Sequence, residues 1–262
     1  MMRFCVLASG SKGNATYVEG GGVRLLIDAG LSCRALEQRL AARGIDPAGL
    51  DAILITHEHT DHIGGLDRFA ARYHLPVYAN EGTASVVERQ CLQAKREPPA
   101  FALFESGVPF ALGALTVCPV QIPHDTAEPV AFTLSDGERQ LGYFTDLGTP
   151  TQSVALAIAQ CHSLILESNH DLDLLRTSGR PYSLVSRISG TSGHLSNEQA
   201  SQLIAHVCPP QLCQLILAHL SLDCNQPDVA LQVMRHTLQT LHREDVALTV
   251  AQQNTPLDWM EV

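Results

Sequence analysis

The sequence has no CxxC pair, no excess of positive charge and no apolar run long enough to cross a membrane. Its eight cysteines lie mostly within apolar stretches, as expected for buried thiols in a reducing compartment, so we expect a cytoplasmic protein. The first residues are apolar for too short a distance to form a signal peptide. Lysine and arginine number 17 against 27 aspartates and glutamates, which excludes a general attraction to nucleic acid or membrane. A polyanionic partner therefore needs a locally positive site.

Length and composition fit one domain. The chain has 262 residues, of which 45% are hydrophobic, and no Pro-, Gly- or Ser-rich linker divides it, so we predict a single domain over 1–262. Strand-like and helix-like segments alternate in both halves. Between Phe101 and Tyr143 turn residues multiply, which indicates consecutive antiparallel strands. The pattern predicts an α/β fold with two facing sheets and helices outside.

The most informative stretch is 51–65, which reads DAILITHEHTDHIGG. Ala52–Ile55 is a short apolar run typical of a buried strand, and strongly polar residues follow it directly. Four potential metal ligands stand within six residues: His57, His59, Asp61 and His62. Imidazole suits zinc, iron and manganese, and a carboxylate in the set favours a hydrolytic site over a structural thiolate site. We predict a metal site here.

Other polar residues also follow apolar strands, namely Asp28, His124, Asp146, Glu167 and His219. Strand ends are the usual place for a site in layered α/β folds, so we expect these side chains to gather there. Asp28 would be costly to bury unpaired, and we expect it to brace the histidine loop from behind the ligands. His194 precedes a helix marked by the capping box of Ser196 and Gln199, where exposed amides favour an anion.

The loop SGSKGN, residues 9–14, separates the first two expected strands. Backbone amides around Gly10 and Gly13, together with Lys12, could hold a phosphate, although the P-loop order GxxxxGK[ST] is absent. An ordinary hairpin turn is the alternative. The candidate substrate-binding residues are Ser9, Ser11, Lys12 and Asn14, together with Asn169, which could instead close a turn.

Taken together, these motifs resemble the metallo-β-lactamase-fold hydrolases over almost the whole chain. The aspartate after the third strand, the HxHxDH motif and the later histidine, aspartate and histidine occur in that family's order. The resemblance implies an αββα sandwich of two mixed sheets, and two divalent metal ions, which could be zinc, manganese or iron. It implies that His57, His59 and His124 hold one ion, that Asp61, His62 and His219 hold the other, and that Asp146 bridges them.

Within that superfamily, the segments ASGSKGN, ESNHD, GHLSNEQA and LAHLS are similar to the YycJ (WalJ) group of metal-dependent nucleases. This implies phosphodiester hydrolysis, with DNA expected more than RNA and 5'-to-3' exonuclease action as in the group. Glu167 and His194 resemble the glutamate and histidine pair of tRNase Z and of the PhnP phosphodiesterases, and we expect catalysis to use both with Asp61. Val185 and Leu222 stand where the group is expected to carry lysines, and both changes remove possible contacts to a phosphate backbone.

Two metal ions about 3.5–4 Å apart can bridge a water and lower its pKa toward neutrality. His194, oriented by Glu167, is then the candidate general acid or electrostatic stabiliser. The alternatives are a small cyclic nucleotide or other phosphodiester as substrate, or a thioester or lactone hydrolase, which would share the ligands without requiring His194. A non-catalytic metal-binding protein would be expected to lack a ligand, and none is missing. A homodimer is also possible, because homodimers are common among proteins in general.

Overall fold

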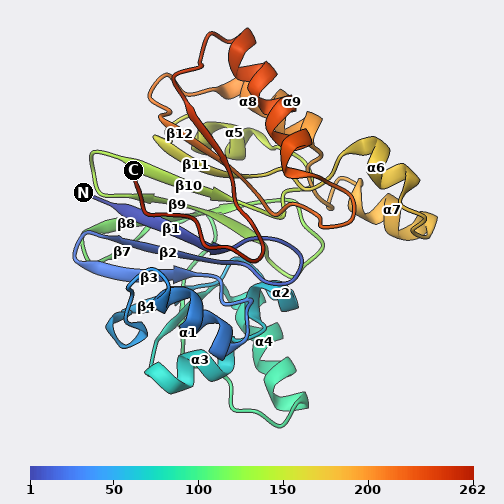
Figure 1. Cartoon of the computed structure of the whole chain (residues 1–262). Coiled ribbons are helices and arrows are strands. Elements are labelled where there is room, and N and C mark those ends of the chain that lie inside the picture. Colours follow the sequence, from blue (N-terminus) through green and yellow to red (C-terminus); the bar gives the residue numbers. More distant parts are fainter.

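The computed structural model describes all 262 residues and has two mixed seven-stranded sheets that face each other between outer helices (Figure 1). The first sheet has the order β14 (Met260–Glu261), β1 (Arg3–Ala8), β2 (Ala15–Gly20), β3 (Val23–Ile27), β4 (Ala52–Leu54), β5 (Val77–Ala79) and β6 (Phe101–Leu103). The second has the order β13 (Ala247–Val250), β12 (Gln214–Ala218), β11 (Ser163–Glu167), β10 (Gln140–Phe144), β9 (Val130–Ser135), β8 (Leu115–Gln121) and β7 (Phe110–Leu112). This arrangement confirms the predicted αββα fold class.

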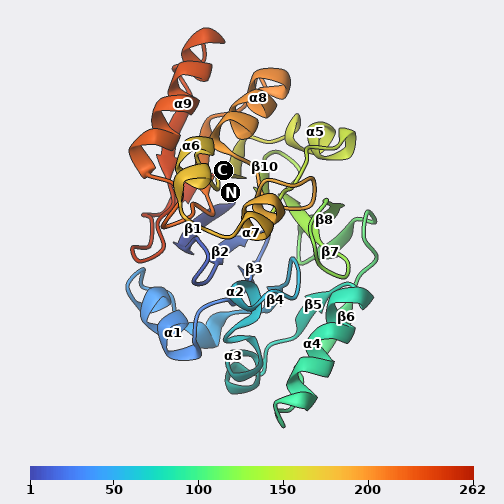
Figure 2. The ribbon, with the colours of Figure 1, turned by 90° about the vertical axis from the view of Figure 1, so that its right-hand side faces the viewer.

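Helices cover the outer face of each sheet (Figure 1). The first sheet is covered by α1 (Cys33–Ala41), α3 (Leu66–Tyr73) and α4 (Glu81–Gln93), and the second by α5 (Gln152–Ile158), α8 (Asn197–Val207) and α9 (Pro227–Thr240). The short helices α2 (Thr60–Ile63), α6 (Leu172–Thr177) and α7 (Tyr182–Ile188) lie together at one edge of the sandwich (Figure 2). A 3₁₀ turn, η1, spans Pro47–Gly49. None of the helices combines the length and the apolar character that crossing a bilayer requires.

The alternation of side chains along the strands explains the layers. In β3, Leu25 and Ile27 point into the core between the sheets, whereas Leu26 points into the core beneath the helices, as expected when successive residues face opposite sides of a sheet. Leu36 and Leu40, four residues apart on α1, are fully buried against that same outer core. The apolar pattern therefore fixes which strand faces point inward.

One predicted pairing is wrong. The sequence predicts consecutive antiparallel strands from Phe101 onward, but β6 lies at the edge of the first sheet and runs parallel to β5. The reason is the connection between them, because α4 crosses over the sheet and returns the chain in the same direction. The antiparallel run begins at β7 and continues through β8 and β9 to β10.

The topology brings one end of several strands to a common edge. Strands β10, β11 and β12 run parallel in the second sheet, and β3 runs parallel to β4 in the first. The polar residues singled out in the sequence lie at or just beyond the ends of these strands. They lie on the side of the sandwich where α2 and α7 are found (Figure 2). The fold therefore gathers residues that are far apart in sequence at one edge.

Candidate metal centre

Three predicted site residues share a rare backbone conformation directly after their strands. Asp28, Asp146 and His219 have φ angles of 62°, 57° and 55°, the left-handed region that residues other than glycine seldom adopt. Each such residue costs on the order of 1 kcal/mol or more, and strained residues of this kind concentrate at functional sites. The sharp turn points each side chain inward, toward the loop that follows β4.

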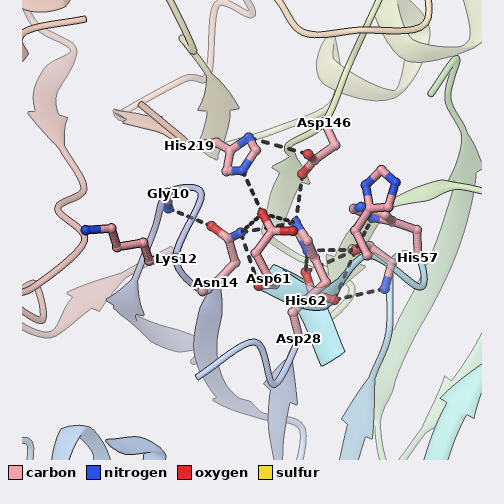
Figure 3. Close-up of polar contacts among 12 residues, drawn as sticks. Gly10, Lys12, Asn14, Asp28, His57, Asp61, His62, Asp146 and His219 are labelled. Atoms are coloured by element: carbon pink, nitrogen blue, oxygen red, sulfur yellow. Dashed lines mark hydrogen bonds and ion pairs between the residues drawn. The ribbon is translucent and has the colours of Figure 1, made fainter. Parts of the chain in front are cut away.

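The seven predicted ligands converge into overlapping clusters, in each of which the ligand atoms lie within 4.8 Å of one another. The first cluster contains His57, His59 and His124, the second contains Asp61, His62 and His219, and the third joins Asp146 to His57 and His62. A fourth joins Asp146 and His219 to Glu167 and His194, which are not among the predicted ligands. Asp146 therefore lies between the two histidine groups, as Figure 3 shows for most of these side chains.

Contacts behind the rings fix the orientation of four imidazoles. Their Nδ1 atoms are held by Thr56 Oγ1 for His57 (3.0 Å), by Asp28 Oδ2 for His62 (2.8 Å), by the Gly193 carbonyl for His124 (3.1 Å) and by Glu167 Oε1 for His219 (2.8 Å). The other nitrogen, Nε2, is left for the site. Such outer partners are typical of metal-binding histidines, because they set the tautomer and the ring orientation.

Two atoms at the centre of the cluster have no hydrogen-bond partner although they are buried, namely His57 Nε2 and Asp146 Oδ2. Asp146 Oδ2 lies 3.1 Å from His62 Nε2, within ion-pair distance, but the two atoms do not form a hydrogen bond. A buried polar atom without a partner costs about 1–3 kcal/mol, so a native structure rarely keeps several side by side. A divalent cation would supply the missing partner, and the set of imidazoles and carboxylates fits such an ion.

The electrostatics leave Asp146 and His57 in the forms that bind metal. Burial would raise the pKa of Asp146, but the neighbouring histidines, first His219 and then His62, hold that pKa well below its usual range. Burial, reinforced by His62, lowers the pKa of His57 well below its usual value. The site therefore offers an ionised carboxylate and a neutral imidazole, and ligands must be deprotonated to coordinate. For His62 and His219, burial would lower the pKa, but the carboxylate of Asp146 raises it well above its usual value, so a bound cation would have to displace their protons.

Asp28 lies behind the ligands, where the sequence predicts it. It is fully buried, its Oδ1 accepts hydrogen bonds from the Thr56 amide and hydroxyl, both at 3.0 Å, and its Oδ2 accepts from His62 Nδ1 at 2.8 Å. Tyr143 donates a further hydrogen bond to Oδ2 at 3.3 Å. Asp28 therefore ties the loop after β4 to the ring of His62.

Replacing Asp28 by alanine is expected to lower the affinity for zinc by about 10- to 100-fold, because His62 loses the acceptor that orients it. Isothermal titration of metal-stripped protein measures this. Asp67→Ala is the matched control, since Asp67 is also buried but pairs with Arg96 outside the site. Equal zinc affinities in wild type and Asp28→Ala would contradict the bracing role.

Glu167 organises the part of the site nearest α8. It is fully buried at the end of β11, and its Oε1 lies 2.9 Å from His194 Nδ1 and 2.8 Å from His219 Nδ1. Its Oε2 accepts hydrogen bonds from the amides of Leu147 at 2.8 Å and Leu195 at 3.0 Å. All of these contacts are to protein and orient the two histidines, and the predicted participation of Glu167 in catalysis stays a prediction.

His194 is thereby fixed with its second nitrogen free. Burial would lower the pKa of His194, but the carboxylate of Glu167 outweighs burial and raises it. The side chain is 21% exposed and lines a cavity of about 300 Å³ beside the predicted ligands. The cavity is walled by Ser11, His59, Thr60, Asp61, Asp125, Asp146, Arg187, Ile188, Gly193, His194 and His219. His194 can therefore exchange a proton with a molecule in this cavity.

Three of the predicted substrate-binding residues are buried. Ser9, Asn14 and Asn169 are at most 5% exposed. Ser9 Oγ accepts from the His219 amide at 2.7 Å, and Asn169 Nδ2 donates to the His219 carbonyl at 2.8 Å. Asn14 Nδ2 lies 3.1 Å from His62 Nε2 and 3.4 Å from Asp61 Oδ2. These side chains hold the ligand-bearing loops in place and offer little surface to a substrate, and their predicted contact with it stays a prediction.

The loop of residues 9–14 is also closed to an anion. The amides of Gly10, Lys12, Gly13 and Asn14 all donate within the protein, for example Lys12 to Gln253 Oε1 at 2.9 Å and Asn14 to the Asp61 carbonyl at 2.7 Å. The side chain of Lys12 points away from the cluster (Figure 3). Of the predicted substrate-binding residues only Ser11 lines the cavity.

The cavity also contains two residues that the sequence did not single out, Asp125 and Arg187. The Nε of Arg187 donates to Asp125 Oδ2. Asp125 could have been suspected, because it directly follows the predicted ligand His124. Arg187 carries no such signal, because it is 62 residues away from Asp125 in the sequence.

Comparison with known proteins places this fold and site in a family. Residues 23–219 match the family described as the beta-lactamase superfamily domain, and the chain belongs to that superfamily. It is 36% identical over 238 residues to the exodeoxyribonuclease YycJ of Bacillus anthracis, covering 91% of this chain and 89% of the relative. It is 32% identical over 236 residues to the exodeoxyribonuclease WalJ of Streptococcus pneumoniae, covering 90% and 88%.

Among solved structures, the metallo-β-lactamase-fold protein YhfI of Bacillus subtilis superposes with a TM-score of 0.73 at 17% identity, covering 98% of this chain and all of that one. At that identity the likeness shows the fold alone. It agrees with the two facing sheets, and it confirms the metallo-β-lactamase fold that the motifs predict.

Proposed function

We propose that this protein is a metal-dependent phosphodiester hydrolase that acts on nucleic acid, with DNA as the preferred substrate and 5'-to-3' exonuclease action. The observation that carries the proposal is the arrangement at the cavity, where seven potential ligands, two of which have a buried atom without a hydrogen-bond partner, lie beside a histidine with one free nitrogen. Support also comes from the curated relatives named exodeoxyribonuclease, which this chain matches over about nine tenths of its length.

The residues have separable tasks in this reaction. Two divalent ions held by the two ligand clusters would polarise the phosphoryl oxygens and activate water, and we propose zinc, manganese or iron for them. His194, with Nδ1 held by Glu167, donates a proton from Nε2 to the departing oxygen, which would otherwise leave as an alkoxide. Asp28 and Glu167 keep His62 and His219 in position. Cytoplasmic location and a homodimer stay predictions.

The test is cleavage of duplex DNA labelled at either the 5' or the 3' end, with manganese or zinc added back to stripped protein. We expect mononucleotide release from the 5' end and its loss in Asp146→Ala. Release from the 3' end would overturn the direction alone. Cleavage of bis(p-nitrophenyl) phosphate without any cleavage of DNA would favour a small phosphodiester, which the cavity of about 300 Å³ could also hold, and cleavage of neither would overturn the proposal.

Metal removal is expected to destabilise the fold. Bound ions would offset the repulsion between the clustered carboxylates and would give a partner to the buried ligand atoms that lack one. Binding contributes RT ln(1 + [L]/Kd), which is about 4 kcal/mol at a free ion concentration 1,000 times Kd. We therefore expect the melting temperature to fall on chelation and to recover with zinc or manganese. The control is Asp146→Ala, in which added metal should give a much smaller rise. An unchanged melting temperature in the wild type would contradict a metal centre of useful affinity.

A further inference from the structure

The cavity wall holds three carboxylates, Asp61, Asp125 and Asp146, but a single arginine or lysine, Arg187. Metal ions would offset the charge of Asp61 and Asp146, which are predicted ligands, whereas Asp125 lies outside that set. A phosphodiester is an anion, and the chain as a whole has a formal net charge of −10. Attraction of the substrate therefore has to come from this cavity, and Arg187 is its permanent cation.

Arg187 is held by only one side of its guanidinium. Its Nε donates to Asp125 Oδ2, and its two terminal nitrogens make no hydrogen bond within the protein. Asp125 Oδ1 lies 3.6 Å from His124 Nε2, a predicted metal ligand. The ion pair between Asp125 and Arg187 therefore places the guanidinium beside the predicted metal centre, with the Asp125 carboxylate between them. Free terminal N–H groups in this planar fork match the oxygens of a phosphate, which arginine binds in bidentate fashion.

The position of Arg187 also lets it move. It lies on α7, which has no buried residue, and its side chain is 59% exposed. Figure 2 shows α7 over the same edge of the sandwich as α2, which carries Asp61 and His62. An ion pair at this level of exposure is weak, so a phosphate can draw the guanidinium away from Asp125 at small cost.

We propose that Arg187 binds the phosphate next to the one that is cleaved, and that Asp125 holds the guanidinium at the rim of the cavity between turnovers. The inference rests on the proposed function and adds a substrate preference to it. Substrates with consecutive phosphates, such as DNA, gain this contact, whereas a single isolated diester does not. The scissile phosphate itself belongs to the metal centre and His194.

The test compares KM and kcat for duplex DNA and for bis(p-nitrophenyl) phosphate. Arg187→Ala is expected to raise the KM for DNA by roughly tenfold or more, since a hydrogen bond to a charged group contributes about 1.5–3 kcal/mol. The kcat for DNA and the KM for the single diester should change much less. Arg187→Lys should recover only part of the loss, because lysine keeps the charge but lacks the fork. Arg176→Ala is the control, since Arg176 is 70% exposed and pairs with Asp173 away from the cavity.

A double variant separates phosphate binding from simple neutralisation of Asp125. If Arg187 only neutralised that carboxylate, Arg187→Ala combined with Asp125→Asn would regain the wild-type KM for DNA, and the proposal would be overturned. We expect the double variant to keep the raised KM and Asp125→Asn alone to lower it, with bound metal quantified in each. An equal rise in KM for both substrates would overturn the assignment to the neighbouring phosphate, whereas failure of wild type to cleave either substrate would overturn the proposed function itself.

Discussion

His194→Ala is expected to lower the turnover of phosphodiester substrates by about 10²- to 10⁴-fold, the usual contribution of a positioned general acid. The free nitrogen of His194 faces the cavity while its Nδ1 is held 2.9 Å from Glu167, so alanine removes the proton donor. Bound metal should stay at the wild-type level, because His194 lies outside the predicted ligand set. Steady-state kinetics with bis(p-nitrophenyl) phosphate, together with metal analysis, measure both quantities, and His236→Ala on the exposed face of α9 is the control.

The pH dependence gives this prediction a second readout. Burial opposes protonation of His194, but the Glu167 carboxylate prevails and raises the pKa above the usual value. A raised pKa keeps the imidazole protonated below it, and the acid is lost as the pH rises through it. Wild-type kcat should therefore fall on the alkaline side, and His194→Ala should lose that limb. If the variant kept full phosphodiester turnover while a thioester or lactone proved to be the better substrate, the thioester or lactone hydrolase would become the better account.

Glu167→Ala is expected to have the largest effect on stability. The fully buried carboxylate accepts from two histidines and from the amides of Leu147 and Leu195. Removing one partner of a buried charged network costs about 3–5 kcal/mol, because the other partners stay buried without an acceptor. Each kcal/mol lowers the melting temperature by about 2–4 °C at this chain length. Calorimetry of metal-stripped protein should therefore show a fall of roughly 6–20 °C, with the exposed Glu88→Ala as control.

The same residue fixes how this contribution depends on pH. Burial would raise the pKa of Glu167, but His194 and His219 bring it down to about 2 from an ordinary value of 4.5. A depressed pKa means that the stabilisation is present above about pH 4.5 and is lost as the pH falls toward 2. The difference in stability between wild type and Glu167→Ala should shrink over that range. A difference that stays constant with pH would show that the packing of the side chain, rather than its charge, stabilises the site.

The gathering of the predicted ligand residues could be anticipated because their signals are local. The pattern of apolar strands marks these positions by itself. His57 and His59 come just after an apolar strand, and His124, Asp146 and His219 occupy the same kind of position at the ends of later strands. The structure brings these side chains into overlapping groups, within each of which the ligand atoms lie no more than 4.8 Å apart. The fold class was predictable for the same reason, since the alternation seen in β3 is a period-2 pattern that can be read without coordinates.

What the sequence could not predict depends on contacts between distant segments. Asn14 is predicted from its loop to bind substrate, yet its side chain reaches Asp61 and His62 nearly 50 positions away. The pairing of Asp125 with Arg187 joins residues 62 positions apart, and no local pattern marks it. Nor does the chain show in advance that Glu167 holds His219 as well as His194, because that depends on the register between β11 and β12.

The most direct test of the account is the rate of bis(p-nitrophenyl) phosphate hydrolysis by metal-stripped wild-type protein, before and after manganese or zinc is restored. The account predicts almost no hydrolysis by the stripped protein and a rate that rises in proportion to bound metal, until the two ligand clusters are filled. Hydrolysis that is indifferent to the chelator, or full metal binding without cleavage of any phosphodiester, would contradict the claim that this site is a metal-dependent phosphodiester hydrolase.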